Sequence, residues 1–293
     1  MPATLPPLVS ADELAAALAS DADGAEIVVL DATTRLAVTA EGEPYTVSPD
    51  QDGYLAEHLP GAVFADVPNA LSDPGGRFAF TLPSPQRFAE AAGRLGIGDG
   101  THVVVYDTAT NAWATRVWWL LRVFGHDAVS VLDGGLSAWK AAGHLVESGS
   151  VTPRPSTFTA RPRPELIADT EEVRKLSEEG GVVVNTLDPA TYRGEVEVSP
   201  YSRRGRIPGS TNLPFFTLLD PATGRFLDRP ALGAALEAAG LLTGDRTVTY
   251  CGGGVAATLP AFAAYVVDGT ELAVYDGSLS EWTADAALPV EVG

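Results

Sequence analysis

The sequence predicts an α/β protein built from two duplicated domains, each a mostly parallel sheet with helices on both faces. Two observations support this prediction. Segments of the first half of the chain recur in the same order in the second half. Within each half, short runs of β-branched residues alternate with Ala- and Leu-rich stretches, which is the pattern of strands joined by helices.

The repeat consists of matched segments that keep their order along the chain. They are Val28–Asp31 with Val182–Asn185, His58–Ala62 with Arg206–Ser210, Val103–Asp107 with Val248–Cys251, and Leu132–Trp139 with Tyr275–Trp282. The offset between the copies falls gradually, as expected when two copies differ by small insertions and deletions. Two copies of domain length indicate a duplication rather than a solenoid.

The matched segments place one domain at residues 1–145 and the other at residues 166–293. Residues 146–165 join them and contain Pro153, Pro155, Pro162 and Pro164, which favour an extended linker. In the second copy we expect strands at 182–184, 247–250 and 272–275. We expect helices there at 171–179, 229–239 and 255–267.

The charge and composition exclude several classes of function. The 38 acidic and 19 basic residues give a net charge of −19, which argues against binding to nucleic acid or to an anionic membrane. Residues 1–20 do not resemble a signal peptide, and no apolar stretch is long enough to span a bilayer. A single cysteine cannot form an intramolecular disulfide, which fits a reducing cytoplasm. The four histidines have no ligand spacing, so no metal site is predicted.

The one cysteine, Cys251, follows a predicted strand and precedes three glycines, Gly252–Gly254. In open α/β sheets, ligands bind beyond the carboxyl ends of the strands. Three glycines let the backbone curl so that successive N–H groups point at one atom, and a following helix adds partial positive charge. Both effects favour the thiolate, which is the reactive form of cysteine. We therefore expect Cys251 to be a catalytic nucleophile.

Other interpretations of this loop fit less well. A buried structural cysteine is common, but core packing gives no reason for three glycines at one turn. The Gly-x-Gly-x-x-Ala pattern after Cys251 matches a dinucleotide fingerprint, but the acidic residue expected at the end of the next strand is missing. A cysteine phosphatase would have an arginine at the position of Ala257, and a cysteine protease would need a histidine, which the second copy lacks.

With this duplication and this loop, the sequence resembles the two-domain sulfurtransferases of the rhodanese superfamily over nearly the whole chain. The matching motifs are Leu30-Asp31, His58–Ala62, Arg116–Trp119, Leu132–Gly135, Cys251–Val255 and Asp276–Ser278. The resemblance implies a catalytic second domain and a silent first domain, in which Asp107 stands at the cysteine position.

The resemblance also implies a reaction in two half-steps. Cys251 would take a sulfane sulfur from a donor as a persulfide and pass it to a thiophilic acceptor, which is cyanide, a thiol or a reduced thioredoxin-like protein. No cofactor would be needed. The negative sulfur would be stabilised by the backbone N–H groups of Gly252, Gly253, Gly254, Val255 and Ala256.

Two small anionic donors are typical of this family, thiosulfate and 3-mercaptopyruvate. The loop is closer to the Cys-Gly-Ser-Gly-Val-Thr-Ala of the mercaptopyruvate type, with Gly253 and Ala256 in place of the two hydroxyl residues. It has neither these hydroxyl groups nor the basic residues that follow the cysteine in the thiosulfate type. The loop therefore gives mercaptopyruvate a slight preference.

The groups that would bind an anionic donor must come from elsewhere, because Thr191 replaces the arginine that the family places before Tyr192. The candidates are Arg193, Arg203, Arg204 and Arg206, with His58 facing the site from the first domain. A solvated surface cluster is the equal alternative for the arginines. The alternative to an enzyme is a non-catalytic sulfur-sensing or protein-interaction module of the same fold.

Overall fold

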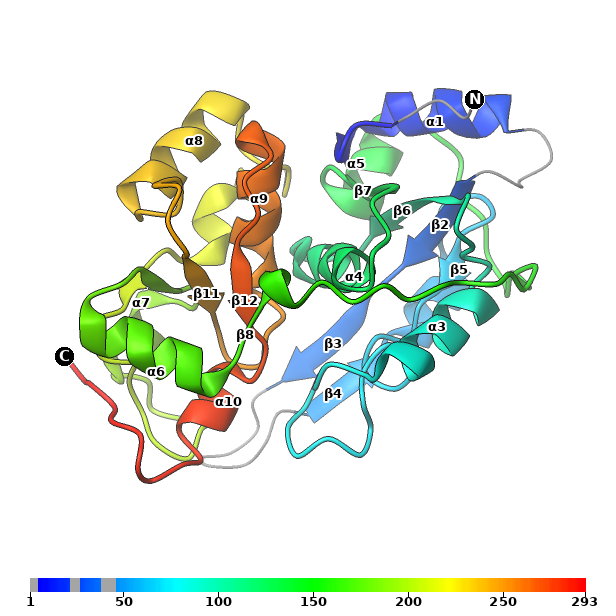
Figure 1. The fold of residues 1–293 in the computed structure, drawn as a ribbon. Helices are drawn as coiled ribbons and strands as arrows, with labels where there is room; N and C mark the ends of the chain where they lie inside the picture. The colour runs from blue at the N-terminus through cyan, green and yellow to red at the C-terminus, as the bar shows by residue number, and fades with distance from the viewer. Residues whose placement is uncertain (1–4, 22–26, 38–45) are drawn as a thin grey trace.

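The computed structural model describes residues 5–21, 27–37 and 46–293, and within it the two halves of the chain form two sheets of the same topology (Figure 1). The first sheet has the order β1-β7-β6-β2-β5 and the second has the order β8-β12-β11-β9-β10, which correspond strand by strand. Every pairing within these two sheets is parallel. The predicted fold class and duplication are confirmed.

The strands are short and buried, as expected for a sheet that is covered on both faces. In the first sheet they are β1 Leu8–Val9, β2 Ile27–Asp31, β5 Val63–Phe64, β6 His102–Tyr106 and β7 Val129–Leu132. In the second they are β8 Ile167–Ala168, β9 Val183–Asn185, β10 Thr211–Asn212, β11 Val248–Tyr250 and β12 Ala273–Tyr275.

The helices also correspond between the copies. The first domain has α1 Ala11–Ser20, α2 Gln51–Ala56, α3 Pro85–Arg94, α4 Ala112–Val123 and α5 Gly135–Ala141. The second has α6 Thr170–Glu179, α7 Pro189–Arg193, α8 Arg229–Ala238, α9 Thr258–Asp268 and α10 Ser278–Trp282, with short 3₁₀ turns at Pro164–Leu166 and Phe215–Leu218. Helix α9 begins three residues later than the sequence predicts.

The late start of α9 has a backbone cause. Gly254 has a φ of +75°, which an α-helix cannot contain, so the residues after Cys251 form turns and the helix begins only at Thr258. Pro260 then lies in the first turn of the helix, where its missing N–H group has no intrahelical partner to lose.

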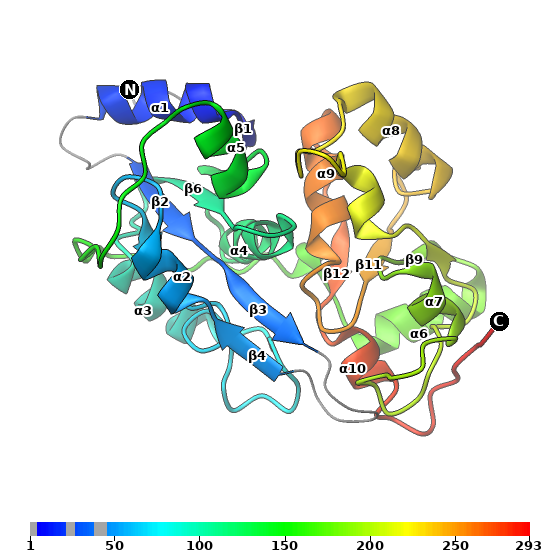
Figure 2. The ribbon, with the colours of Figure 1, turned by 180° about the vertical axis from the view of Figure 1, so that it is seen from behind.

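The first copy contains one insertion that the repeat pattern does not predict. Strands β3 Thr34–Ala37 and β4 Thr46–Pro49 pair antiparallel, outside the main sheet. Both ribbon views show this pair reaching from the first domain toward the second (Figures 1 and 2). Leu36 of β3 lies there beside the second domain, in the wall of a cavity shared by both.

The two domains share one buried core, in which α4 packs against α9. Every residue of α4 is buried, because this helix has the first sheet on one side and the second domain on the other. The Trp118 ring meets the Phe262 ring edge to face at 5.0 Å, and the hydroxyl groups of Thr115 and Thr258 lie 2.9 Å apart. Trp118 and its neighbour Trp119 are therefore core residues.

Equivalent hydrogen bonds cross the interface between the domains in both copies. The Asp276 carboxylate accepts a hydrogen bond from the Leu82 N–H group of the first domain at 2.8 Å. The matching residue of the first copy, Asp133, accepts one from the Phe226 N–H group of the second domain at the same distance. Each domain thus holds a loop of the other at the carboxyl edge of its own sheet.

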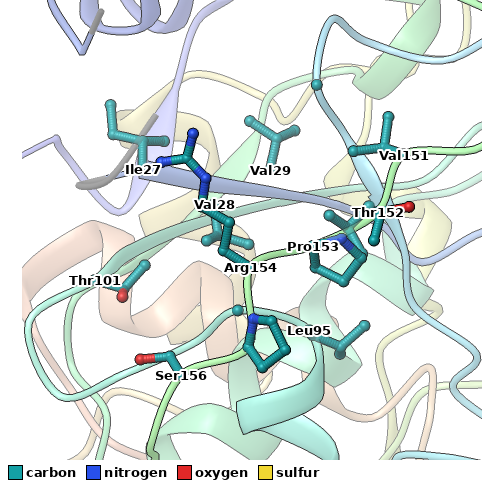
Figure 3. Close-up of a pocket in the computed structure, with 14 residues that line it drawn as sticks. Ile27, Val28, Val29, Leu95, Thr101, Val151, Thr152, Pro153, Arg154 and Ser156 are labelled. Carbon is teal, nitrogen blue, oxygen red and sulfur yellow. The ribbon is translucent and has the colours of Figure 1, made fainter. Parts of the chain in front are cut away.

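The linker is extended and lies along the first domain (Figure 1). It is held by main-chain bonds, among them Ser156 N to Gly93 O at 2.9 Å and Arg163 N to Val123 O at 2.7 Å. A cavity of about 500 Å³ lies between the linker and β2 (Figure 3). Among the described residues that line it, Arg154 is the one ionisable side chain and none belongs to the cysteine loop, so this cavity is separate from the surroundings of Cys251.

Candidate active site

Cys251 follows β11 at the carboxyl edge of the second sheet, where the sequence places it. Its side chain is buried, and it forms part of the wall of a cavity between the two domains. The Ser278 hydroxyl oxygen lies 3.9 Å from Sγ. The Cys251 side chain is therefore mostly enclosed by protein and borders the cavity on one side.

The turn between β12 and α10 fixes the start of the cysteine loop. The Ser278 hydroxyl accepts hydrogen bonds from the N–H groups of Cys251 at 3.0 Å and Gly254 at 3.1 Å, and it donates to the Tyr275 carbonyl. The Ser280 N–H and hydroxyl groups both donate to the Gly252 carbonyl. These bonds hold the loop from behind and leave its other face to the cavity.

Among the loop glycines, Gly254 is the one at which a residue with a side chain would not fit. Its φ of +75° is a left-handed conformation, and a Cβ atom there would lie 2.6 Å from the Asp276 carbonyl oxygen. Gly253 has more space, since a Cβ atom there would lie 3.3 Å from the Phe80 ring. The Phe80 ring of the first domain thus covers the middle of the loop.

The first copy shows what this type of loop binds. Asp107 occupies the position of Cys251, and its carboxylate accepts hydrogen bonds from the backbone N–H groups of Ala109, Thr110, Asn111, Trp113 and Ala114 at 2.8–3.1 Å. The loop therefore forms a nest of N–H groups around one buried anion.

In the second copy, most of the corresponding backbone N–H groups have no hydrogen-bond acceptor within the described chain. By the offset between Asp107 and Cys251, they are Gly253, Gly254, Val255, Ala257 and Thr258. Within the described chain, the N–H groups of Gly253, Val255 and Ala257 have no hydrogen-bond acceptor. Donors of this kind can hold a negatively charged sulfur at the end of the Cys251 side chain.

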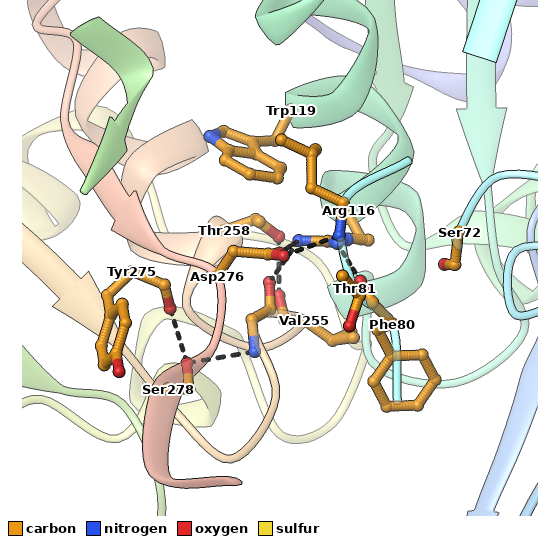
Figure 4. Close-up of polar contacts among 12 residues, drawn as sticks. Ser72, Phe80, Thr81, Arg116, Trp119, Val255, Thr258, Tyr275, Asp276 and Ser278 are labelled. Atoms are coloured by element: carbon orange, nitrogen blue, oxygen red, sulfur yellow. Dashed lines mark hydrogen bonds and ion pairs between the residues drawn. The ribbon is translucent and has the colours of Figure 1, made fainter. Parts of the chain in front are cut away.

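Arg116 of α4 ties the first domain to the cysteine loop (Figure 4). Its guanidinium is fully buried and donates to the Asp276 carboxylate at 2.6 Å, to the Gly254 carbonyl at 3.1 Å and to the Phe80 carbonyl at 2.6 Å. The guanidinium also lies over the Trp119 ring at 4.7 Å. One side chain therefore joins the cysteine loop, the end of β12 and the loop that carries Phe80.

The cavity has a volume of about 460 Å³ and is lined by both domains. The first domain contributes Leu36, Phe80, Thr110, Ala112 and Trp113, and the second contributes Leu187, Asp188, Thr191, Val196, Val198, Pro200, Tyr201, Phe215, Cys251, Gly252, Gly253, Val255 and Ala256. Of the predicted loop residues only Gly254 is outside this lining, with its carbonyl bound to Arg116. The cavity is thus a cleft between the two domains, and most of its surface is apolar.

The structure places the predicted arginines outside the lining of the cavity, and Arg203 and Arg206 both have other partners. The Arg203 guanidinium donates to the carbonyl groups of Trp282, Thr283, Asp285 and Leu288. Arg206 pairs with Glu291 at 2.7 Å and lies over the Tyr192 ring at 4.6 Å. Both side chains hold the C-terminal segment against the second domain, and neither lines the cavity.

Arg193 and Arg204 also have other partners. Arg193 forms an ion pair with Glu195 at 2.7 Å, and Arg204 donates to the Glu197 carbonyl at 2.9 Å. Neither residue lines the cavity. The structure therefore does not bring the four arginines together around Cys251, and their place is structural or at the surface.

His58 also lies outside the lining of the cavity. It is fully buried in the first domain, where its ring stacks on Tyr54 at 4.3 Å and Nδ1 lies 2.8 Å from the Tyr54 carbonyl. Its backbone forms a bridge with Glu147, as Arg206 does with Glu291 in the second copy. The duplicated turn is thus a structural feature in both domains, and it does not bring His58 to the cleft.

The sequence analysis missed four contributors to the site: Phe80, Trp113, Asp188 and Arg116. Arg116 carried a signal, since an arginine inside a strongly apolar helix must have a buried partner. Phe80 and Trp113 carried no such signal, because their local sequence does not indicate that they would cover a loop more than a hundred residues away.

Two absences concern the part of the chain that the structure describes. No cluster of His, Cys, Asp or Glu side chains there could hold a metal ion. None of the helices in the same residues is long and apolar enough to cross a membrane.

Comparison with known proteins agrees with this geometry. A family model of the Rhodanese-like domain matches residues 10–142 and 169–285. The chain is 36% identical over 276 residues to a 3-mercaptopyruvate sulfurtransferase of Escherichia coli, covering 94% of this chain and 95% of that one. It is 35% identical over 281 residues to a thiosulfate sulfurtransferase of Bos taurus, covering 94% and 91%. The crystal structure of SseA from Escherichia coli superposes with a TM-score of 0.76 at 32% identity, over 93% of this chain and 98% of that one.

The chain therefore belongs to the rhodanese-like family, with two such domains in tandem. Within that family it is an enzyme of the sulfurtransferase class, because relatives that match it over nearly their whole length have this activity.

Proposed function

We propose that this enzyme moves a sulfane sulfur from 3-mercaptopyruvate or thiosulfate, through a persulfide on Cys251, to a thiophilic acceptor such as a thiol, cyanide or a reduced thioredoxin-like protein. The observation that supports this most directly is the nest around Asp107. The same loop in the second copy carries a thiol where the first copy carries an anion, and it has free N–H groups around it. We place this reaction in the cytoplasm, where the single cysteine stays reduced.

In the first half-reaction, the Cys251 thiolate attacks the thiol sulfur of mercaptopyruvate or the outer sulfur of thiosulfate and forms an S–S bond. With mercaptopyruvate, the C–S bond of the donor breaks and the pyruvate enolate leaves and takes up a proton. With thiosulfate, the S–S bond of the donor breaks and sulfite leaves. In the second half-reaction, the acceptor attacks the outer sulfur of the persulfide and Cys251 leaves as the thiolate.

Of the two donors we favour mercaptopyruvate. Thiosulfate carries two negative charges, which need more compensation when they leave water. Lysine, arginine and histidine are absent from the described lining of the cleft. Mercaptopyruvate carries one carboxylate, at the far end from the reacting sulfur.

The proposal is tested by mass spectrometry of the intact protein after incubation with each donor. Cys251 should gain about 32 Da, the mass of one sulfur atom, and lose it again when a thiol is added. The control is Cys251→Ser, which should gain nothing. A wild-type chain that stays unmodified with both donors would overturn the proposal and favour a non-catalytic role for the fold.

A further inference from the structure

In the proposed reaction, the cleft around Cys251 holds the charged end of a small anionic donor without the help of a cation. Lysine, arginine and histidine are absent from the lining residues that the structure describes. A carboxylate that leaves water there depends on hydrogen bonds from uncharged groups. The nest around Asp107 shows that this chain holds a buried carboxylate in this way, with backbone N–H groups alone. We therefore expect N–H and hydroxyl groups of the cleft to bind the charged end of the donor.

Two corresponding loops border this cleft, one from each domain. The loop after β6 leads into α4, and the cysteine loop after β11 leads into α9. The hydroxyl groups of Thr115 and Thr258, near the starts of the two helices, lie 2.9 Å apart. Thr110, in the loop of the first domain, lines the cavity together with Cys251. The first domain thus brings its own copy of the loop to the wall of the cleft.

A short series of contacts joins Thr110 to the cysteine loop. A Cβ atom at Gly253 would lie 3.3 Å from the Phe80 ring, and that ring meets the Trp113 ring at 5.2 Å. The N–H groups of Trp113 and Thr110 donate to the two oxygens of the Asp107 carboxylate, at 3.1 and 3.0 Å. The Asp107 carboxylate therefore fixes the backbone of Thr110 close to the cysteine loop.

The Thr110 side chain has an unused hydrogen-bond donor. The side chains with hydroxyl groups in the described lining are Thr110, Thr191 and Tyr201. The Thr191 hydroxyl donates to the Asp188 carboxylate at 2.6 Å, whereas no described residue accepts a hydrogen bond from the Thr110 hydroxyl. Thr110 is only half-buried, so its hydroxyl is accessible to a ligand in the cleft.

On the basis of the proposed sulfur transfer, we propose that the Thr110 hydroxyl donates a hydrogen bond to the carboxylate of mercaptopyruvate while the donor sulfur lies at Cys251. The first domain then supplies a substrate-binding residue, and Asp107 holds that residue in place through its N–H group. The bond forms at the end of the donor that does not react. It therefore acts on binding of the donor rather than on the chemical step.

The test measures the first half-reaction in single turnovers, before any acceptor is added. The rate at which Cys251 gains sulfur is followed by mass at increasing mercaptopyruvate concentrations, which gives a half-saturating concentration and a limiting rate. Thr110→Val removes the hydroxyl and keeps the shape of the side chain. We expect its half-saturating concentration to rise about tenfold, as for the loss of a hydrogen bond to a charged group, and its limiting rate to stay within about twofold.

Two controls separate this role from an effect on the fold. Thr110→Ser keeps the hydroxyl and should leave both values near those of the wild-type protein. Thr108→Val removes a hydroxyl from an exposed position of the same loop, outside the described lining, and should also change neither value. Transfer of sulfur from loaded Thr110→Val to 2-mercaptoethanol, which has no carboxylate, should proceed at the wild-type rate.

The outcomes distinguish this inference from the proposed function on which it rests. A wild-type half-saturating concentration in Thr110→Val, or an equal rise in Thr110→Ser, would overturn the role of the Thr110 hydroxyl and leave the sulfur transfer in place. Failure of the wild-type protein to take up sulfur from mercaptopyruvate would overturn the proposed donor and this inference together.

Discussion

Asp107 and Cys251 occupy the same position in the two copies, and the difference between them separates a structural loop from a reactive one. In the first copy the carboxylate occupies the nest of N–H groups permanently. In the second copy the thiol leaves part of the nest free. The duplication has thus kept one anion-binding loop and used it for two purposes.

The first prediction concerns Asp107. Replacing Asp107 with Ala leaves several buried N–H groups without an acceptor, so the free energy of unfolding should fall by about 3 kcal/mol or more. Asp107→Asn keeps one acceptor oxygen and should cost about half as much. Urea unfolding of the two variants measures both values. A loss below about 1 kcal/mol for Asp107→Ala would contradict the role of the nest.

Among the elements, α4 and the turn after β12 decide where the cysteine loop lies. Arg116 projects from α4 into the second domain and binds the loop at Gly254, while Ser278 and Ser280 bind it from the other side. The first domain is therefore a support for the cysteine loop as well as a wall of the cleft. Arg116 acts here as a positioning residue, since it contacts the loop rather than the cavity.

The second prediction tests this role of Arg116. Arg116→Met removes the charge, leaves Asp276 unpaired and should lower the free energy of unfolding by about 3–5 kcal/mol. A misplaced loop should also lower kcat for sulfur transfer by about tenfold or more, with a smaller change in KM.

The control for Arg116→Met is the double variant with Asp276→Asn. It removes the unpaired charge and should recover part of the stability but little of kcat, because the bond to the Gly254 carbonyl is still missing. Full recovery of kcat in the double variant would mean that Arg116 affects only stability.

The predictable features of the structure are those that repeat or that follow from local chemistry. The strands at 182–184, 247–250 and 272–275 agree with β9, β11 and β12 to within one residue, because buried β-branched runs have few other solutions. The position of Cys251 at a strand end was predictable for the same reason.

The arginines were not predictable from the sequence. Arg203 is held by four backbone carbonyls of the C-terminal segment, and no local pattern encodes that arrangement. The insertion β3–β4 breaks the repeat, so the comparison of the two copies could not reveal it. The lining of the cleft depends on how the domains pack, and this is set by contacts between residues far apart in the chain.

At the scale of the whole molecule, the two domains form one hydrophobic unit. One buried cluster contains residues of both sheets and both central helices. The reciprocal bonds of Asp133 and Asp276 to loops of the opposite domain add polar contacts on either side of this cluster. The second domain without the first would expose the α9 surface and lose one wall of the cleft.

The last prediction follows from this shared core. Because α4 and α9 bury each other, the protein should unfold in a single cooperative transition, with equal calorimetric and van't Hoff enthalpies, despite its two domains.

Trp118→Ala removes the ring that meets Phe262 and should lower the free energy of unfolding by about 3–5 kcal/mol. Hydrogen exchange should show this loss equally in β6 and β11, one strand from each sheet. As the control, Leu14→Ala truncates a side chain in a cluster confined to the first domain, and it should lower the protection of both strands as well. Two separate transitions, or a loss in one sheet alone, would mean that the domains fold independently and that the interface only positions the loop.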